Sequence, residues 1–315
     1  MPFVPLFYRP AARRGSLLRA RVRQAAQLLL ALPALWVAGA ALAAPPVELT
    51  HLHGQAVELR RVPPDALPAA GTIVFENGLR GDLEGWSAVI AGLAPATRQG
   101  WALFAYNRPG IGRSEETERP RDGQQVVADL RELLRQHDLK PPFLLVGHSL
   151  GGLYQQLFAR TYPGEVRGLV LVDAVYPGVI KKPEDFPLYT RMAKRLFMSR
   201  MAARETEAIH ATGEQVLALP WPAQVSVERL VNVPKSPGAI GVDFGVVNND
   251  AATAARVRAM YPGARTTVLD SDHQIQKANP EAVVRAVIDL IGPAGLAPDV
   301  AARLAAGGVS PVSGR

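Results

Sequence analysis

The amino-acid sequence predicts an α/β fold, with a mostly parallel central sheet flanked by helices. Short apolar runs alternate along the chain with segments whose apolar residues recur at helical spacing. Strands of this kind form parallel sheets that are covered on both faces. Several of the apolar runs end directly in polar residues, and binding sites in such sheets form beyond the carboxyl ends of the strands. The pattern therefore predicts both the fold class and the place of a site.

The expected elements follow one another from residue 47 to residue 291. Two strands, Val47–Leu52 and Ala56–Val62, are separated by His53-Gly54, which is a hairpin signal. Further strands are expected at Thr72–Phe75, Trp101–Tyr106, from Phe143 to the glycine at 147, and at Gly168–Asp173, Ile240–Val247 and Thr266–Leu269. Helices are expected over Trp86–Leu93, after an N-cap at Asp122, after Ser149, over Ala251–Tyr261, and at the end around Val283 to Ile291.

The sequence G-H-S-L-G at 147–151 lies between an apolar strand and a helical pattern. A serine hydroxyl is a poor nucleophile unless it is exposed beside a base and near donors that hold an oxyanion. Gly147 and Gly151 lack side chains, so strand and helix can approach closely and leave Ser149 at the top of a tight turn. A five-residue match also arises by chance, but the strand before it and the helix after it favour a nucleophile. We therefore expect Ser149 to be the nucleophile and the Leu150 N–H to be an oxyanion donor.

Two other strand ends carry glycine-containing loops. The strand at Thr72–Phe75 ends in Glu-Asn-Gly-Leu-Arg-Gly at 76–81, a loop that can present backbone N–H groups to a neighbouring site. The strand at Trp101–Tyr106 ends in Asn-Arg-Pro-Gly-Ile-Gly-Arg-Ser at 107–114, which proline and two glycines make a compact turn. This second loop lacks the G-K-[ST] of a phosphate cradle and precedes no obvious helix, so we interpret it as structural.

The first 43 residues have the three parts of an export signal. Six arginines precede an Ala/Leu-rich apolar run, Ala25–Ala44, and the run closes with Ala41-Leu42-Ala43. We expect cleavage after Ala43 and a periplasmic or secreted protein. The run approaches the roughly 20 residues that span a bilayer, so an uncleaved N-terminal membrane anchor is the alternative.

Composition excludes several other classes of protein. The chain has no cysteine, so it can form neither a disulfide framework nor a thiolate metal site. The formal net charge is +7, and removing the six arginines of the first 43 residues leaves +1, which argues against a nucleic-acid partner. His51 and His53 could share a strand face and hold a metal, but no third ligand is near, so we interpret them as exposed histidines.

The predicted domain extends over residues 44–292 and is followed by an Ala/Gly/Pro-rich tail at 293–315. Between about 176 and 237 the alternation of strands and helices is interrupted. An amphipathic helix with a methionine-bearing face is expected over Phe186–Ala203, followed by proline-punctuated sequence. An insertion at this place would lie over the carboxyl-end cleft as a helical lid, with an ordinary core helix as the alternative.

Taken together, the order of parts resembles the α/β-hydrolase fold superfamily, in particular its serine esterases and lipases. The resemblance extends from about Val47 to Ile291 and includes four motifs. They are the loops at 76–78 and 107–114, the turn around Ser149, and Ser-Asp-His at 271–273 with Asn-Pro-Glu at 279–281. The resemblance implies that His273 is the general base and that the Leu79 N–H is the second oxyanion donor. Asn77 stands where the family often has histidine, and Asn107 where it often has aspartate.

The acid that orients the base has two candidates at strand ends. Asp250 follows the strand expected at Ile240–Val247, which is the family's more common position, and we favour it. Asp173 ends an earlier strand, an arrangement that some members resemble. The expected strand before Asp250 is a poor one, since it contains Asp243, itself a third and weaker candidate.

The resulting hypothesis is an exported serine hydrolase that cleaves a small-molecule carboxylic ester through an acyl-enzyme on Ser149. Such a mechanism needs no metal and no organic cofactor. A serine nucleophile disfavours the dehalogenase and epoxide hydrolase chemistry of family members that use aspartate. The alternatives are an amide- or peptide-cleaving member of the same family and a non-catalytic member that binds a ligand.

Overall fold

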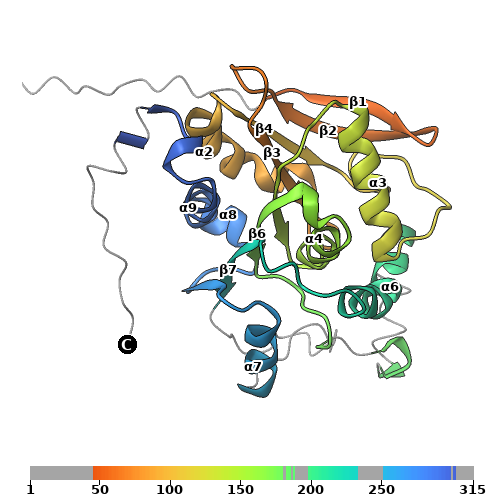
Figure 1. Ribbon diagram of the computed structural model, residues 1–315. Helices are drawn as coiled ribbons and strands as arrows, with labels where there is room; N and C mark the ends of the chain where they lie inside the picture. The colour runs from red at the N-terminus through yellow and green to blue at the C-terminus, as the bar shows by residue number, and fades with distance from the viewer. Residues whose placement is uncertain are drawn as a thin grey trace, which may run out of the picture. The chain divides into compact units, whose positions relative to one another are not determined.

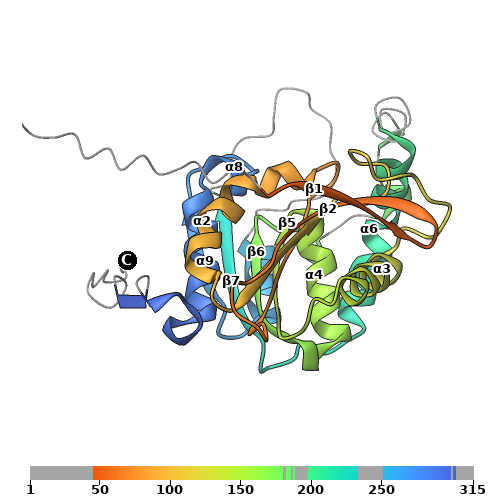
Figure 2. The same ribbon diagram turned by 90° about the horizontal axis from the view of Figure 1, so that it is seen from above.

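The computed structural model describes residues 45–179, 182–185, 187–188, 198–232, 251–298 and 301–302. All of them belong to one compact unit that begins at Ala44. The expected export signal and its cleavage position lie outside the described residues. Within that unit a central sheet is flanked by helices on both faces, as Figures 1 and 2 show. The predicted fold class is thereby confirmed.

Eight strands of the described part of the chain form one sheet, in the order β1-β2-β4-β3-β5-β6-β7-β8. Strands β3 to β8 are parallel, and β2 is antiparallel to both β1 and β4. The strands are β1 (Val47–Leu52), β2 (Gln55–Val62), β3 (Gly71–Glu76), β4 (Trp101–Tyr106), β5 (Phe143–His148), β6 (Val166–Val172), β7 (Ser226–Asn232) and β8 (Arg265–Leu269).

The helices form two layers, one on each face of the sheet. Helices α2, α8 and α9 lie on one face, and α3, α4 and α6 lie on the other (Figure 2). The helices are α2 (Ser87–Thr97), α3 (Gly123–Gln136), α4 (Leu150–Thr161), α6 (Arg200–Leu217), α7 (Ala251–Met260), α8 (Ile275–Ala278) and α9 (Pro280–Ile291). Short 3₁₀ turns lie at Leu83–Trp86, Pro163–Glu165, Pro183–Asp185 and Pro293–Gly295.

Each central strand contributes side chains to two apolar cores. In β5, Leu145 packs into the core under α3 and α4, whereas Leu144 and Val146 pack into the core under α2 and α9. All three side chains are fully buried. Burial on both faces explains why these strands are continuous apolar runs in the sequence.

Local signals at the element ends behave as expected. Asp122 caps α3, and its side chain accepts a hydrogen bond from the Gln125 N–H. The β1–β2 hairpin turns at His53 and Gly54, both of which have positive φ (52° and 85°), as a two-residue hairpin turn requires.

The boundaries predicted for the lid are wrong at the C-terminal end. The strand between β6 and β8 is β7 at Ser226–Asn232, inside the segment of 176–237 that was expected to be a lid. Glu228 and Arg229 interrupt the apolar pattern of β7, which hides the strand in the sequence. Both can be buried there because each has a polar partner on a neighbouring segment. The strand expected at Ile240–Val247 lies outside the described residues.

The helix expected over Phe186–Ala203 falls largely outside the described residues, and α6 begins only at Arg200. Helix α6 packs beside α3 and α4, and its Thr212 Oγ1 accepts a hydrogen bond from the Gly123 N–H of α3 at 2.9 Å. No helix of the described residues is long and apolar enough to span a bilayer.

Candidate active site

Ser149 occupies a strained turn between β5 and α4. Its backbone has φ 50° and ψ −119°, a conformation that side-chain-bearing residues rarely adopt. A Cβ atom added to Gly147 would lie 2.6 Å from Gly152 Cα, and one added to Gly151 would overlap the backbone of Glu76 and Asn77. The close approach that these two glycines permit is therefore what holds the serine at the end of the strand.

The loop after β3 lies directly against this turn. A Cβ added to Gly78 would come within 3.1 Å of Ser149 Cβ and 2.7 Å of His148 Nδ1. The next peptide N–H, that of Leu79, and the first N–H of α4, that of Leu150, donate none of the hydrogen bonds found among the described residues. Two backbone donors beside a serine are the composition of an oxyanion hole.

His273 lies in the loop between β8 and α8, and its partner is Asp173. The distance from His273 Nδ1 to Asp173 Oδ2 is 2.7 Å, and Asp173 Oδ1 accepts from the Asn232 N–H at 3.3 Å. With the proton on Nδ1 directed at the carboxylate, Nε2 keeps the lone pair that a general base requires. The imidazole is 51% exposed and the carboxylate 23%.

The structure thus pairs the base with one of the acids that the sequence left open. Asp173 directly follows β6, the strand next to β5, and has φ 40°. Asp250, which we favoured, lies outside the described residues, as does Asp243. Sequence reasoning ranked Asp173 second because it relied on a strand at Ile240–Val247. Had β7 been recognised, the neighbouring ends of β5, β6 and β7 would have pointed to Asp173.

His148 is a residue of the site to which the sequence analysis assigned no role. It is buried between Gly78 and His273, and its Nε2 lies 2.9 Å from the carbonyl oxygen of His273. Because that oxygen only accepts, Nε2 carries the proton. Burial lowers the pKa of His148 to about 4, and the neighbouring His273 adds to this effect. The ring is therefore neutral at pH 7 and connects the His273 loop to the Ser149 turn.

The two departures from the family pattern are accommodated by local contacts. Asn77 donates from Nδ2 to the Tyr106 carbonyl at 3.2 Å. Asn107 accepts from the Leu83 N–H at 2.7 Å and donates to Glu58 Oε2, also at 2.7 Å. Since Glu58 already supplies a carboxylate, an amide at position 107 complements it where an aspartate would repel it.

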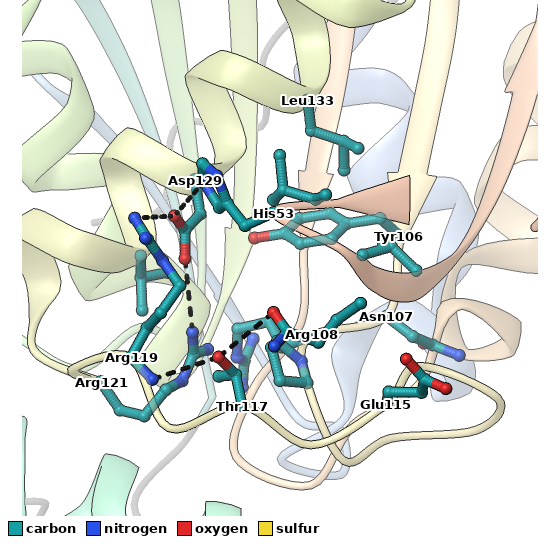
Figure 3. A pocket seen from close by; sticks show the side chains of 15 residues that line it. His53, Tyr106, Asn107, Arg108, Glu115, Thr117, Arg119, Arg121, Asp129 and Leu133 are labelled. Atoms are coloured by element: carbon teal, nitrogen blue, oxygen red, sulfur yellow. Dashed lines mark hydrogen bonds and ion pairs between the residues drawn. The ribbon is translucent and has the colours of Figure 1, made fainter. Parts of the chain in front are cut away.

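A separate pocket lies between the β1–β2 hairpin, α3 and the loop that follows β4 (Figure 3). None of the residues Ser149, His273 and Asp173 lines it. On its wall His53 pairs with Asp129 at 3.3 Å, and Asp129 also contacts Arg119 and Arg121. No group of three or more potential metal ligands occurs in the described part of the chain, and His53 has this carboxylate as its partner.

Comparison with known proteins identifies the family. The model of the alpha/beta hydrolase fold family matches residues 71–236, more than half of the chain. The protein therefore belongs to the α/β hydrolase fold family. The match includes the Ser149 turn, the Asp173 strand end and β7.

Individual relatives cover smaller parts of the chain. The uncharacterised protein YqjL of Bacillus subtilis is 36% identical over 102 residues, which are 32% of this chain and 39% of YqjL. The non-heme chloroperoxidase of Streptomyces lividans is 32% identical over 130 residues, 40% of this chain and 44% of that protein. The aligned part is thus less than half the length of either relative.

Solved structures extend the likeness to the whole fold. The structure of a probable hydrolytic enzyme from Pseudomonas aeruginosa PAO1 matches with a TM-score of 0.55 and 18% identity, covering 79% of this chain and 95% of that one. At this identity the likeness concerns the arrangement of sheet and helices.

Proposed function

We propose that this protein is a hydrolase that cleaves carboxylic esters of small molecules through an acyl-enzyme on Ser149. The observation that carries the proposal is the pairing of His273 with Asp173 beside the strained serine turn. A serine becomes a useful nucleophile when a base oriented by a carboxylate is at hand. Support for this role comes from the pairing of His273 with Asp173 and from the bond of His148, the residue before Ser149, to the His273 carbonyl.

In the proposed first step, Ser149 Oγ attacks the ester carbonyl carbon while His273 Nε2 takes the hydroxyl proton. The negative charge that develops on the carbonyl oxygen is stabilised by the N–H groups of Leu79 and Leu150. His273 then gives its proton to the departing alcohol, leaving the acyl group on Ser149. Asp173 keeps the imidazole in the correct tautomer and stabilises its charged form without taking the proton itself.

In the second step, water replaces the alcohol. His273 removes a proton from the water as it attacks the acyl carbon, and returns that proton to Ser149 Oγ as the acid leaves. Both steps use the same groups in the same roles, because the tetrahedral intermediates are alike.

The test is a hydrolysis series with p-nitrophenyl esters from acetate to palmitate, with the matching p-nitroanilides as the amide arm. Ester turnover that falls to background in Ser149→Ala is the expected result. Turnover of the anilides at comparable rates would move the assignment to amide cleavage. Absence of any Ser149-dependent turnover would support the non-catalytic alternative.

We further propose that the protein is exported to the periplasm or beyond. Support comes from the basic, apolar and A-x-A parts of residues 1–43. Mass analysis of the exported protein tests this proposal. A chain that begins at Ala44 is expected, and one that still contains Met1 and remains with the membrane would indicate an uncleaved anchor.

A further inference from the structure

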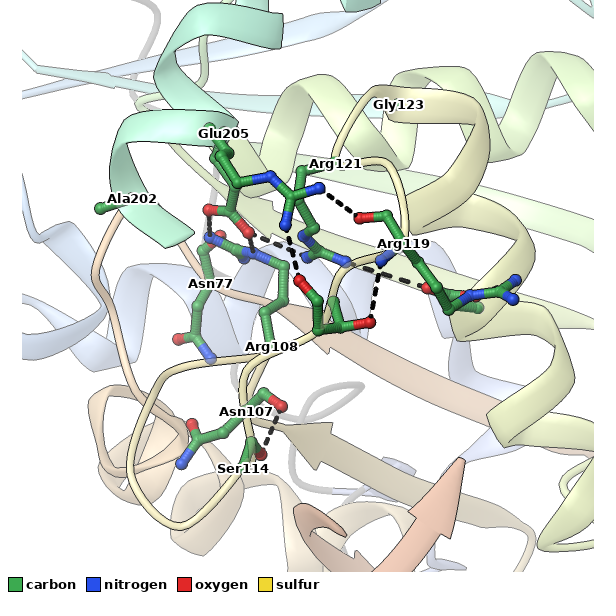
Figure 4. A network of polar contacts seen from close by, with 12 residues as sticks. Asn77, Asn107, Arg108, Ser114, Arg119, Arg121, Gly123, Ala202 and Glu205 are labelled. Carbon is green, nitrogen blue, oxygen red and sulfur yellow. Dashed lines mark hydrogen bonds and ion pairs between the residues drawn. The ribbon is translucent and has the colours of Figure 1, made fainter. Parts of the chain in front are cut away.

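Arg108 is the centre of a buried polar network at the carboxyl end of β4 (Figure 4). Its side chain is 1% exposed, and the guanidinium makes five hydrogen bonds, as many as it has N–H groups. Two go to the carboxylate of Glu205, and one each to Glu76 Oε1 and the carbonyl oxygens of Asn77 and Gly78. Because the guanidinium is planar and all of its donors are used, it fixes the orientation of the two carboxylates and the two carbonyl groups that it contacts.

The bond to the Gly78 carbonyl matters most for the site, because the same peptide group carries the Leu79 N–H. Arg108 Nη2 donates to the Gly78 carbonyl at 2.9 Å. In a planar trans peptide the carbonyl and the following N–H point in opposite directions. Holding the Gly78 oxygen therefore sets the direction of the Leu79 N–H, which is the expected second oxyanion donor. The bond from Nη1 to the Asn77 carbonyl at 2.6 Å fixes the preceding peptide in the same way.

Glu205 holds Arg108 from a helix that is distant in sequence. It lies on α6, 97 residues away, and its two oxygens accept from Arg108 Nε at 2.8 Å and Nη2 at 3.0 Å. Arg121 Nη2 binds the same carboxylate at 2.9 Å. Burial opposes ionisation of Glu205, but the two guanidinium groups outweigh it and hold its pKa below the usual value.

The pairing of buried charges argues for a positional role. Two buried arginines, Arg108 and Arg121, are paired with two buried carboxylates, Glu76 and Glu205, and Arg121 also contacts Asp129. Buried ion pairs often stabilise a fold no more than well-packed apolar side chains would, and an attested use of them is to fix one geometry. The geometry defined here is the path of the loop from Asn77 to Leu79.

We infer that Glu205 and Arg108 are positioning residues for the oxyanion hole, through which α6 sets the orientation of the Gly78–Leu79 peptide. The inference rests on the proposed ester hydrolysis. It gives the loop at 107–114, which we interpreted from sequence as a structural turn, a part in the reaction. It also makes the placement of α6 against α3 and α4 a determinant of the turnover rate.

The test compares Glu205→Gln with the wild type on the best p-nitrophenyl ester. The amide keeps the shape of the carboxylate but loses the charge and one acceptor. Removing one oxyanion donor costs roughly 100- to 1000-fold in kcat, so a misdirected donor is expected to cost roughly 10- to 100-fold. KM should change by less than about threefold, because the ester is bound before the oxyanion forms.

A transition-state analogue provides the second readout. The affinity for a trifluoromethyl ketone, whose adduct with Ser149 carries an oxyanion, should fall in parallel with kcat. Glu228→Gln is the matched control, since Glu228 is also a buried carboxylate paired with an arginine, Arg265, on the neighbouring strand. This control should leave kcat and analogue affinity at wild-type values.

Glu205→Asp keeps the charge and is the second test variant, to be used if Glu205→Gln does not fold. Its shorter side chain withdraws from Arg108, and a kcat loss intermediate between wild type and Glu205→Gln is expected. Folded Glu205 variants with wild-type kcat and analogue affinity would overturn the inference, as would losses no larger than those of Glu228→Gln. The proposed function fails separately, if wild-type turnover does not depend on Ser149.

Discussion

The Ser149 side and the His273 side of the site, which we propose to supply the nucleophile and the base, are built in different ways. Ser149 and Leu150 are buried, and a Cβ added to Gly78, Gly147 or Gly151 would lie within 2.7 Å of a neighbouring atom. Arg108 holds the adjacent loop through the Gly78 carbonyl. His273, in contrast, is about half exposed and is held by two hydrogen bonds, one from its ring to Asp173 and one from His148 to its carbonyl. Steric closeness fixes the first side, and a few polar contacts fix the second.

This difference predicts two kinds of mutational effect. Changes on the base side should remove catalysis while leaving the fold intact, because few packing contacts depend on them. Changes on the nucleophile side should affect catalysis and stability together, because the same close contacts serve both.

The largest effect is expected from Asp173→Asn. The amide has one acceptor oxygen where the carboxylate uses two, so with that oxygen on the Asn232 N–H its NH2 group faces His273 Nδ1 and favours the wrong tautomer. The value of kcat should therefore fall by roughly 10⁴-fold with little change in melting temperature. Steady-state kinetics and thermal unfolding measure the two quantities. Asp250→Asn is the matched comparison and should keep near wild-type kcat. The reverse outcome, with Asp250→Asn inactive and Asp173→Asn active, would return the role to the acid we favoured from sequence.

Next in size is Gly78→Ala on the nucleophile side. Its new methyl group would lie 2.7 Å from His148 Nδ1 and 3.1 Å from Ser149 Cβ, so the loop must shift and carry the Leu79 N–H with it. We expect kcat to fall by roughly 10²-fold, together with a lower melting temperature. Gly164→Ala is the control, because a Cβ there meets nothing within 4 Å. Unchanged kinetics for Gly78→Ala would show that the loop is not packed against the serine.

His148 connects the two sides and makes stability depend on pH. Its pKa is about 4 in the folded protein, whereas an unfolded histidine titrates near 6.5. The unfolded state therefore binds the proton first, and the stability present above pH 6.5 is lost as the pH falls towards 4. The loss from this group is on the order of 3 kcal/mol.

Urea unfolding of the wild type and His148→Gln at pH 7 and pH 4.5 measures this contribution. Glutamine can donate to the His273 carbonyl but does not titrate, so its stability should depend less steeply on pH. The exposed His51→Gln should behave as the wild type does. Parallel pH profiles for wild type and His148→Gln would exclude a buried neutral ring.

The smallest expected effect is that of Asn107→Asp, which restores the residue common in the family. It would place a carboxylate where Glu58 Oε2 now accepts a hydrogen bond at 2.7 Å. A loss of about 1–3 kcal/mol in unfolding free energy is expected, because a donor is lost and a like charge is introduced. Adding Glu58→Gln to that variant should recover part of the loss. Equal stability of the single variant and the wild type would contradict the account of this position.

Most of the fold could be predicted from sequence, because parallel strands that are buried on both faces consist of continuous apolar residues. The strand from Phe143 to His148, the hairpin at His53 and Gly54, and the cap at Asp122 all depend on local signals. β7 was missed because Glu228 is buried in it with a partner 37 residues away, Arg265, which no local pattern can reveal.

The same distinction applies to the site. Ser149 could be proposed from sequence because its turn needs glycines at fixed spacing. Asp173 was ranked second, since choosing between strand ends requires the strand order. The roles of His148, Arg108 and Glu205 depend on contacts between residues 30 to 125 positions apart. Such contacts exist only once the sheet has assembled.

Covalent labelling of the wild type with a fluorophosphonate tests the central claim most directly. The account predicts a single adduct by intact mass, located by peptide mapping on Ser149, absent from Ser149→Ala and formed far more slowly by Asp173→Asn. An unlabelled wild-type protein, or an adduct on another residue, would contradict the assignment of Ser149 as the nucleophile.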